Sequence, residues 1–250
     1  MVNRVILIDN GFLVHRSIFA FRSSGMNLGY LYLRMLLALI KKLNYSVEND
    51  LVIIAIDSKL GSWRKVFIPV YKSNRKSKRE ALESSDWWKE CFKEIEQILK
   101  TLDLYSAFHI VEEAYTEADD IISVAVRYFQ NKECIVVSSD SDLEQLAVYP
   151  NVKIFSIISK KFKNVKNPLK VLEEKIVKGD VADNITNPEN IDIELRRKIF
   201  SLLSLPLEIE TRIRSKLVSV LENKKQFDLN KIPYKSIKED ITKLLKGETL

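Results

Sequence analysis

The sequence predicts an α/β fold with a mostly parallel central sheet and helices on both faces. Apolar, β-branched runs typical of buried parallel strands lie at residues 5–8, 51–56 and 134–137. Stretches with helical spacing separate these runs, and strands joined through helices usually run parallel. An aspartate follows each strand directly or within three residues, at Asp9, Asp57 and Asp140.

The remaining elements follow from spacing and end signals. Residues 105–111 form a third strand candidate along the chain, and 152–158 with 161–165 read as an edge hairpin. Thr116 is expected to cap a helix whose first turn is acidic, as the helix dipole favours. Trp87 and Trp88 are expected to pack in the core or at its rim. Helices are predicted over 12–21, 28–43, 86–102, 117–128, a short stretch to 147, 168–178, 193–203, 206–221 and 236–245.

Composition indicates a soluble globular protein of a reducing compartment. Only two cysteines occur, Cys91 and Cys134, which disfavours a disulfide framework or a zinc–thiolate site. The apolar helix 28–43 carries Arg34 and is too short to span a membrane, and no secretory leader is visible. We therefore expect an intracellular, cytoplasmic protein, or one of the host cytoplasm if a phage encodes it, with no membrane partner and a monomeric state. The net charge of +6 favours nucleic acid as the partner.

The chain is expected to divide into an α/β core over residues 1–185 and a helical C-terminal subdomain over 186–250, with the boundary at Asn187-Pro188. Within the core, residues 58–85 form a basic arch segment. No acidic residue occurs from 58 to 79, and Trp63, Phe67 and Tyr71 alternate with the basic residues. Positive charge with interleaved aromatics is typical of single-strand binding. We expect this segment to be mobile without DNA and to order around a single strand.

Carboxylates cluster where the sheet and helices place them together. They are Asp9, Asp57, Glu117, Asp119, Asp120, Asp140, Asp142 and Asp183. Like charges about 4 Å apart repel by roughly 4 kcal/mol at an effective dielectric of 20, so cations or protons must lie among them. Oxygen ligands favour Mg²⁺, and the presence of only two histidines disfavours zinc. Two such ions would suit in-line displacement at phosphorus, which points to phosphodiester hydrolysis.

The motifs resemble those of the 5′ nuclease family, which includes flap endonucleases and 5′→3′ exonucleases. They occur in the family's order across residues 1–185: Ile8-Asp9; Asp57 with Ser62-Trp63-Arg64 and the run 69–75; Glu117-Ala-Asp-Asp120; the run 138–143; and Gly179-Asp-Val-Ala-Asp-Asn-Ile185. The run Tyr149-Pro-Asn-Val152 and the Trp-rich helix are most similar to a branch named ribonuclease H in T-even bacteriophages. The resemblance implies a PIN-like 5′ nuclease fold.

By position, the resemblance implies two Mg²⁺ ions, with Mn²⁺ as a substitute. Asp9, Asp57, Asp119 and Asp140 would surround the first ion; Asp142, Asp180 and Asp183 would hold the second, with Glu117 and Asp120 shared. Lys72 and Arg75 would act in catalysis at the base of the arch. The expected nucleic-acid contacts are Arg16, Arg64, Lys72, Arg75, Lys76, Lys78, Arg79, Arg196 and Arg197.

The implied substrates are DNA with 5′ single-stranded ends or flaps and RNA–DNA hybrids, in primer or flap removal during replication and repair. A single-strand-binding protein or sliding clamp is a candidate partner. The chain departs from most relatives after Gly179, because no glycine follows until Gly247 and the glycine-rich duplex-binding hairpin is missing. Two alternatives stay open: a PIN-type ribonuclease, and a non-catalytic nucleic-acid-binding relative.

Overall fold

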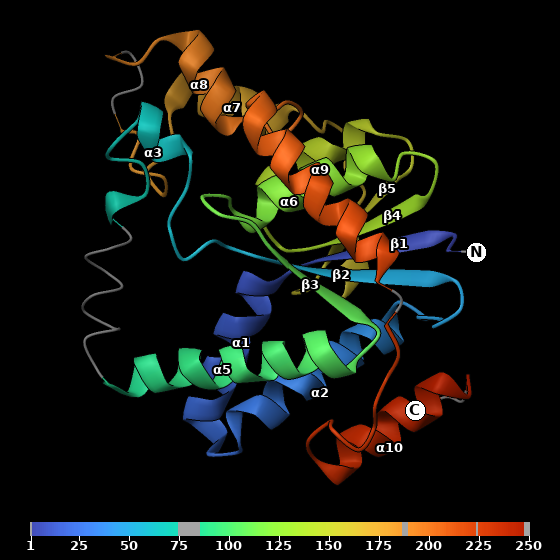
Figure 1. The fold of residues 1–250 in the computed structure, drawn as a ribbon. Helices are drawn as coiled ribbons and strands as arrows, with labels where there is room; N and C mark the ends of the chain where they lie inside the picture. The colour runs from blue at the N-terminus through green and yellow to red at the C-terminus, as the bar shows by residue number, and fades with distance from the viewer. Residues whose placement is uncertain (1, 75–85, 187–189, 224, 248–250) are drawn as a thin grey trace.

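A computed structural model describes residues 2–74, 86–186, 190–223 and 225–247. Its centre is a six-stranded sheet of order β3-β2-β1-β4-β5-β6, as Figure 1 shows. The strands are β1 (Arg4–Asp9), β2 (Asp50–Ile56), β3 (Phe108–Glu112), β4 (Glu133–Val137), β5 (Val152–Ser156) and β6 (Lys161–Phe162). All pair in parallel except β6, which is antiparallel to β5. The predicted α/β fold with a mostly parallel sheet is confirmed.

Helices cover both faces of the sheet (Figure 1). On one face lie α1 (Asn10–Ser24), α2 (Leu28–Lys42), α5 (Asp86–Tyr105) and α10 (Lys235–Leu245). On the other lie α6 (Ala118–Tyr128), α7 (Lys170–Lys178), α8 (Ile193–Phe200) and α9 (Leu207–Glu222). The short α3 (Arg64–Phe67) and the 3₁₀ helix η1 (Asp142–Val148) complete the described elements.

Side-chain alternation in β1 divides the core into two. Val5 and Leu7 enter one cluster, and Ile6 and Ile8 the other. All four are fully buried, because a central parallel strand has helices above and below it. The C-terminal helices share these cores: Ile213 of α9 lies in the first and Ile237 of α10 in the second. The division into subdomains stays a prediction, and its boundary at Asn187-Pro188 lies outside the described residues.

Several predicted element ends were wrong. Helix α5 continues to Tyr105, so the strand predicted from that residue begins at Phe108. Ser106 ends the helix, since its hydroxyl donates to the Leu102 carbonyl and accepts the Phe108 N–H. Glu117, rather than Thr116, is the N-cap of α6. The Thr116 hydroxyl donates instead to the Glu113 carbonyl, 2.9 Å away.

The basic arch segment is packed where the structure describes it. Trp63 and Tyr71 are 4% and 3% exposed and belong to the core beside α6, whereas Phe67 is 40% exposed. Trp63 and Tyr71 are therefore not accessible to a nucleic-acid strand, contrary to prediction, whereas Phe67 is exposed. The mobility of the segment without DNA stays a prediction, and residues 75–85 lie outside the described part. Trp88 is buried, and Trp87 stacks on Phe21, as core or rim packing predicts.

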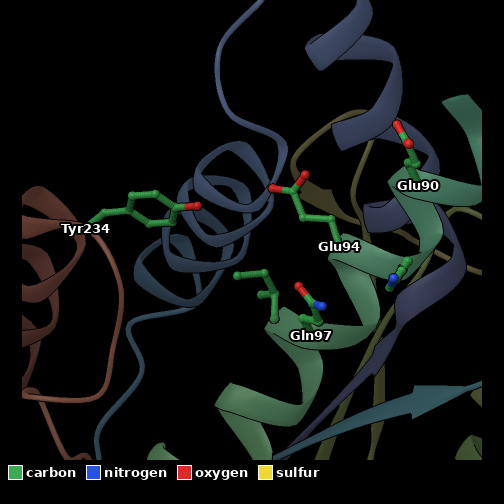
Figure 2. Close-up of a pocket in the computed structure, with 6 residues that line it drawn as sticks. Glu90, Glu94, Gln97 and Tyr234 are labelled. Carbon is green, nitrogen blue, oxygen red and sulfur yellow. The ribbon is translucent and has the colours of Figure 1, made fainter.

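The start of α10 borders a small pocket of about 380 Å³ against α5 (Figure 2). Glu90, Glu94, Gln97 and Tyr234 line it, and none of them is a predicted site residue. The Tyr234 hydroxyl hydrogen-bonds the Asn27 side chain, which ties α10 to the start of α2. None of the helices that the structure describes has the length and apolarity needed to cross a membrane.

Candidate metal centre

A first group of carboxylates lies at the carboxyl edge of the three central strands. Asp9 ends β1, Asp57 follows β2 and Asp140 follows β4, and β1 pairs with both of the other strands. Asp119 adds a fourth carboxylate from the first turn of α6. The sheet order therefore brings together four side chains that are up to 131 positions apart in the sequence (Asp9 to Asp140, 140 − 9).

Burial and mutual repulsion perturb this first group. Burial, with the charges of Asp57 and Asp140 nearby, raises the pKa of Asp9 to about 6. Burial also raises the pKa of Asp119 well above its ordinary value, and the charges of Asp9 and Asp140 add to the effect. Carboxylates held this way favour a bound proton or cation. The group thus has the electrostatics of a cation site.

Backbone and hydroxyl donors orient these carboxylates. The Ser138 hydroxyl donates to Asp9 Oδ2 at 2.8 Å, and the Gly11 N–H donates to Asp9 Oδ1 at 3.0 Å. Asp57 Oδ1 accepts the Ala118 N–H at the start of α6, 2.8 Å away. Each carboxylate is thereby held in position by groups that do not neutralise its full charge.

A second group consists of Asp142, Asp180 and Asp183, whose nearest carboxylate oxygens all lie within 4.8 Å of one another. Asp142 begins η1, and the other two lie in the turn after α7, which the Asp180–Ile185 bridge closes. Asp142 Oδ1 is buried and has no hydrogen-bond partner in the described part of the chain. Burial raises the pKa of Asp142 in spite of the Lys175 ammonium beside it. Oxygen donors with an unsatisfied buried atom fit a hard divalent cation.

Asp120 is not available to a metal ion, contrary to prediction, because its carboxylate is fully engaged. It is 0% exposed and forms a bidentate pair with Arg64, at 2.7 and 3.0 Å. It also accepts the Trp63 indole N–H and the Glu117 backbone N–H. Arg64, predicted to contact nucleic acid, is only 3% exposed. Its charge therefore pairs with Asp120 inside the protein instead of binding nucleic acid.

Glu117 joins this network to the site. It accepts hydrogen bonds from Ser62, Arg64, Tyr71 and Lys72. Burial alone would raise its pKa, but the charges of Arg64 and Lys72 hold the pKa at about 2. Glu117 is therefore ionised and already paired in this structure.

Lys72, within the basic arch segment, lies between Glu117 and the second group. Its ammonium pairs with Glu117 and is 3.9 Å from Asp183 Oδ1, while its backbone N–H donates to the Asp183 carbonyl at 2.9 Å. Its backbone is left-handed, with φ of 54°. The structure thus places the Lys72 ammonium beside two carboxylates, and its catalytic role stays a prediction.

The other predicted nucleic-acid contacts differ in their surroundings. Arg16 on α1 and Arg197 on α8 are exposed. Arg196 is half-buried and donates to the Ile176 and Val177 carbonyls at the end of α7. Four more of the predicted nucleic-acid contacts lie outside the described residues: Arg75, Lys76, Lys78 and Arg79.

A groove of about 1220 Å³ opens beside Asp57, between α1, the loop after β2 and α5. Its floor includes the apolar Val14, Ile95 and Leu99. Lysines line it from three parts of the chain, at Lys59, Lys89, Lys93, Lys100 and Lys216. Acidic residues line the groove as well, at Asp57, Glu96, Asp103 and Glu112. Glu96 pairs with Lys59 and Lys100, so the charge of the lining is mixed.

Sequence reasoning missed three contributors to the site. Lys175 bridges Asp142 and Asp180, the Ser138 hydroxyl orients Asp9, and the Tyr71 hydroxyl donates to Glu117. Ser138 lies in the motif that carries Asp140, which is the one local signal that could have identified it. No local signal in the sequence could have identified Lys175, because its partners Asp142 and Asp180 are 33 and five residues away and lie on other elements.

Known proteins share parts of this sequence. Ribonuclease H of Enterobacteria phage T4 is 34% identical over 142 residues, which covers 54% of this chain and 46% of that protein. A 5′-3′ exonuclease of Mycoplasmopsis pulmonis is 32% identical over 194 residues, 73% of this chain and 61% of that protein. The chain thus spans about half to three-fifths of the length of these two relatives.

A solved structure shares the fold. The flap endonuclease of bacteriophage T5, in a pseudo-enzyme-product complex with DNA and metal ions, matches with a TM-score of 0.58 at 18% identity, over 98% of each chain. The family model for the 5′-3′ exonuclease N-terminal resolvase-like domain matches residues 4–178. The matched region contains the three strand-end carboxylates Asp9, Asp57 and Asp140 and the helix η1, and the chain therefore belongs to the 5′-3′ exonuclease family.

Proposed function

We propose that this chain is a divalent-metal-dependent nuclease that hydrolyses phosphodiesters at the 5′ ends and flaps of DNA duplexes and RNA–DNA hybrids. One observation carries the proposal: the carboxylates of Asp142, Asp180 and Asp183 lie within 4.8 Å of one another, and Asp142 Oδ1 is buried without a hydrogen-bond partner in the described residues. Family membership supports hydrolytic nuclease chemistry. The proposed role is the removal of RNA primers or flaps in DNA replication and repair.

The two groups would hold two ions. Asp9, Asp57, Asp119 and Asp140 would bind the first, and Asp142, Asp180 and Asp183 the second. Mg²⁺ is the proposed ion, with Mn²⁺ as a substitute, because every candidate ligand atom is a carboxylate oxygen. When bound, such a pair of ions supplies a hydroxide nucleophile and stabilises the leaving oxygen.

The chain's own residues would position the substrate. Ser138 and the Gly11 N–H hold Asp9 in one orientation. Lys72 would exchange its contact with Glu117 for the scissile phosphate, where negative charge develops during attack, and Arg75 would assist it.

The test is cleavage of four 5′-labelled substrates: a flap, a nicked duplex, an RNA-primed hybrid and single-stranded RNA. With Mg²⁺ we expect short 5′ products from the first three, and no cleavage in EDTA. Asp140→Asn should abolish cleavage while leaving DNA affinity largely unchanged. Glu144→Gln, two positions beyond Asp142 in η1, serves as a matched control for loss of one nearby carboxylate.

Three outcomes would refute the proposal. Full cleavage in EDTA would exclude the metal-dependent mechanism. Internal cutting of single-stranded RNA with intact flaps would indicate a PIN-type ribonuclease, and tight DNA binding without any cleavage would indicate a non-catalytic relative.

A further inference from the structure

Lys175 carries a positive charge directly into the second carboxylate group. Its Nζ is 2.5 Å from Asp142 Oδ2 and 2.5 Å from Asp180 Oδ2. These two carboxylates, with Asp183, are the ones that lie within 4.8 Å of one another. The ammonium therefore already bonds two of the three carboxylates that a second divalent ion would need.

The lysine is held in place by the fold rather than by chance contact at the surface. Helix α7 is anchored by Leu172 and Ile176, which are 5% and 3% exposed. The Lys175 side chain itself is 18% exposed and its ammonium lies 5.9 Å from the centre of the Phe200 ring. Its two partners come from η1 and from the turn after α7, so three separate elements fix this contact.

The Lys175 ammonium does not provide hydrogen bonds to all buried oxygens of the second carboxylate group. Asp142 Oδ1 stays buried without a hydrogen-bond partner in the described residues, although Oδ2 of the same carboxylate binds Lys175. A divalent ion brings twice the charge and takes more oxygen ligands than an ammonium takes hydrogen bonds. The ion and the ammonium cannot both occupy the space next to Asp142 Oδ2 and Asp180 Oδ2.

We propose that Lys175 is a resident cation of the second carboxylate group, and that a divalent ion binds there only by displacing it. The inference rests on the proposed function, which assigns these carboxylates to a metal ion. The first group differs, since among the described residues Asp9, Asp57, Asp119 and Asp140 form no ion pair with a lysine or arginine. The two ions therefore bind in order, the first tightly and the second weakly.

The first experiment measures Mn²⁺ binding to the full chain by calorimetry, with electron paramagnetic resonance to count bound ions. Lys175→Met should tighten the weaker site by about tenfold to a hundredfold, because no charge-assisted hydrogen bonds have to be broken. The stronger site should change little. Lys175→Arg keeps the charge and should keep the second site weak, and the exposed Lys170→Met on the same helix should behave as wild type.

The second experiment uses the wild-type protein and depends on no variant. Acetylation of each lysine is followed by mass spectrometry in EDTA and then with Mn²⁺. Lys175 should be labelled slowly in EDTA, because two carboxylates hold its ammonium, and several-fold faster once Mn²⁺ displaces it. The exposed Lys170 should be labelled at the same rate in both conditions.

The proposal is wrong if Lys175→Met leaves the weaker site unchanged or weakens it, or if wild-type Lys175 stays protected while two ions are bound. These readouts are independent of nuclease activity. A protein that binds two ions with the expected exchange but cuts no substrate would contradict the proposed function alone. If the wild type cleaves its substrates but Lys175 is acetylated at the same rate with and without Mn²⁺, only this inference is contradicted.

Discussion

The sharpest prediction concerns Arg64, which the structure places in the core instead of at a nucleic-acid surface. Its guanidinium donates to Asp120 at 2.7 and 3.0 Å, to Glu117 at 2.9 Å and to the Ile199 carbonyl at 2.8 Å. It also lies 4.6 Å from the centre of the Trp63 ring. These contacts join α3, α6 and α8 through one buried charge.

Arg64→Met should destabilise the protein strongly, because it leaves the buried Asp120 carboxylate without its bidentate partner. Removing one member of a buried ion pair costs about 3–5 kcal/mol. In a protein of this size each kcal/mol lowers the melting temperature by about 2–4 °C, so a fall of roughly 6–20 °C is expected. The neighbouring Lys65→Met is the matched control, since Lys65 is exposed.

The assay is urea unfolding and thermal melting of the wild type, Arg64→Met, Asp120→Asn and the double variant. The double variant should lose less stability than the sum of the two single losses, by about 1 kcal/mol or more, because both single changes remove the same interaction. DNA affinity of the folded Arg64→Met protein should stay near that of Lys65→Met. Unchanged stability together with a clear loss of DNA affinity would refute the buried role and restore Arg64 as a nucleic-acid contact.

Four further predictions concern the site and its surroundings. In EDTA at pH 7.5, Asp119→Asn should stabilise the protein by about 1–2 kcal/mol, because burial and like charges raise the pKa of Asp119, so ionising it is costly; a lower melting temperature would contradict this. Lys72→Ala should slow single-turnover cleavage about a hundredfold, or about 2.7 kcal/mol, with a smaller loss of affinity, and an unchanged rate at saturating enzyme would remove its catalytic role. Burial lowers the pKa of His109 to about 4 from 6.5, so the unfolded chain binds a proton that the native state does not, and His109 by itself should lower the stability by up to about 3 kcal/mol as pH drops from 6.5 to 4, opposite in sign to the contribution of Asp9, whose pKa is raised. His109→Phe should abolish that fall in urea titrations, whereas a change at the exposed His15 should not. Because side-chain cations, with no glycine-rich hairpin, would hold the duplex, its affinity should fall steeply with salt, and K⁺ should have no advantage over Na⁺ at equal ionic strength.

The sequence by itself determined the fold class and the grouping of the acids, because both depend on local patterns. Unbroken β-branched runs identify strands that are buried on both faces, and β1, β2 and β4 lie where those runs predict. Asp9, Asp57 and Asp140 follow these strands, and the carboxyl ends of parallel strands share one edge whatever the strand order. The sequence thus places these acids on one edge of the sheet, and the strand order β2-β1-β4 then makes them neighbours.

Only the tertiary structure decided which charges are functional candidates and which are structural. Arg64 and Lys65 are adjacent basic residues in one segment, yet one is buried against Asp120, 56 positions away, and the other is exposed. Lys175 reaches Asp142 across 33 positions. Irregular segments have no period from which to predict the side that faces the core, and a hydrogen bond between distant elements leaves no spacing in the sequence. Such partners are set by how the helices pack on the sheet, which is the step that local pattern does not contain.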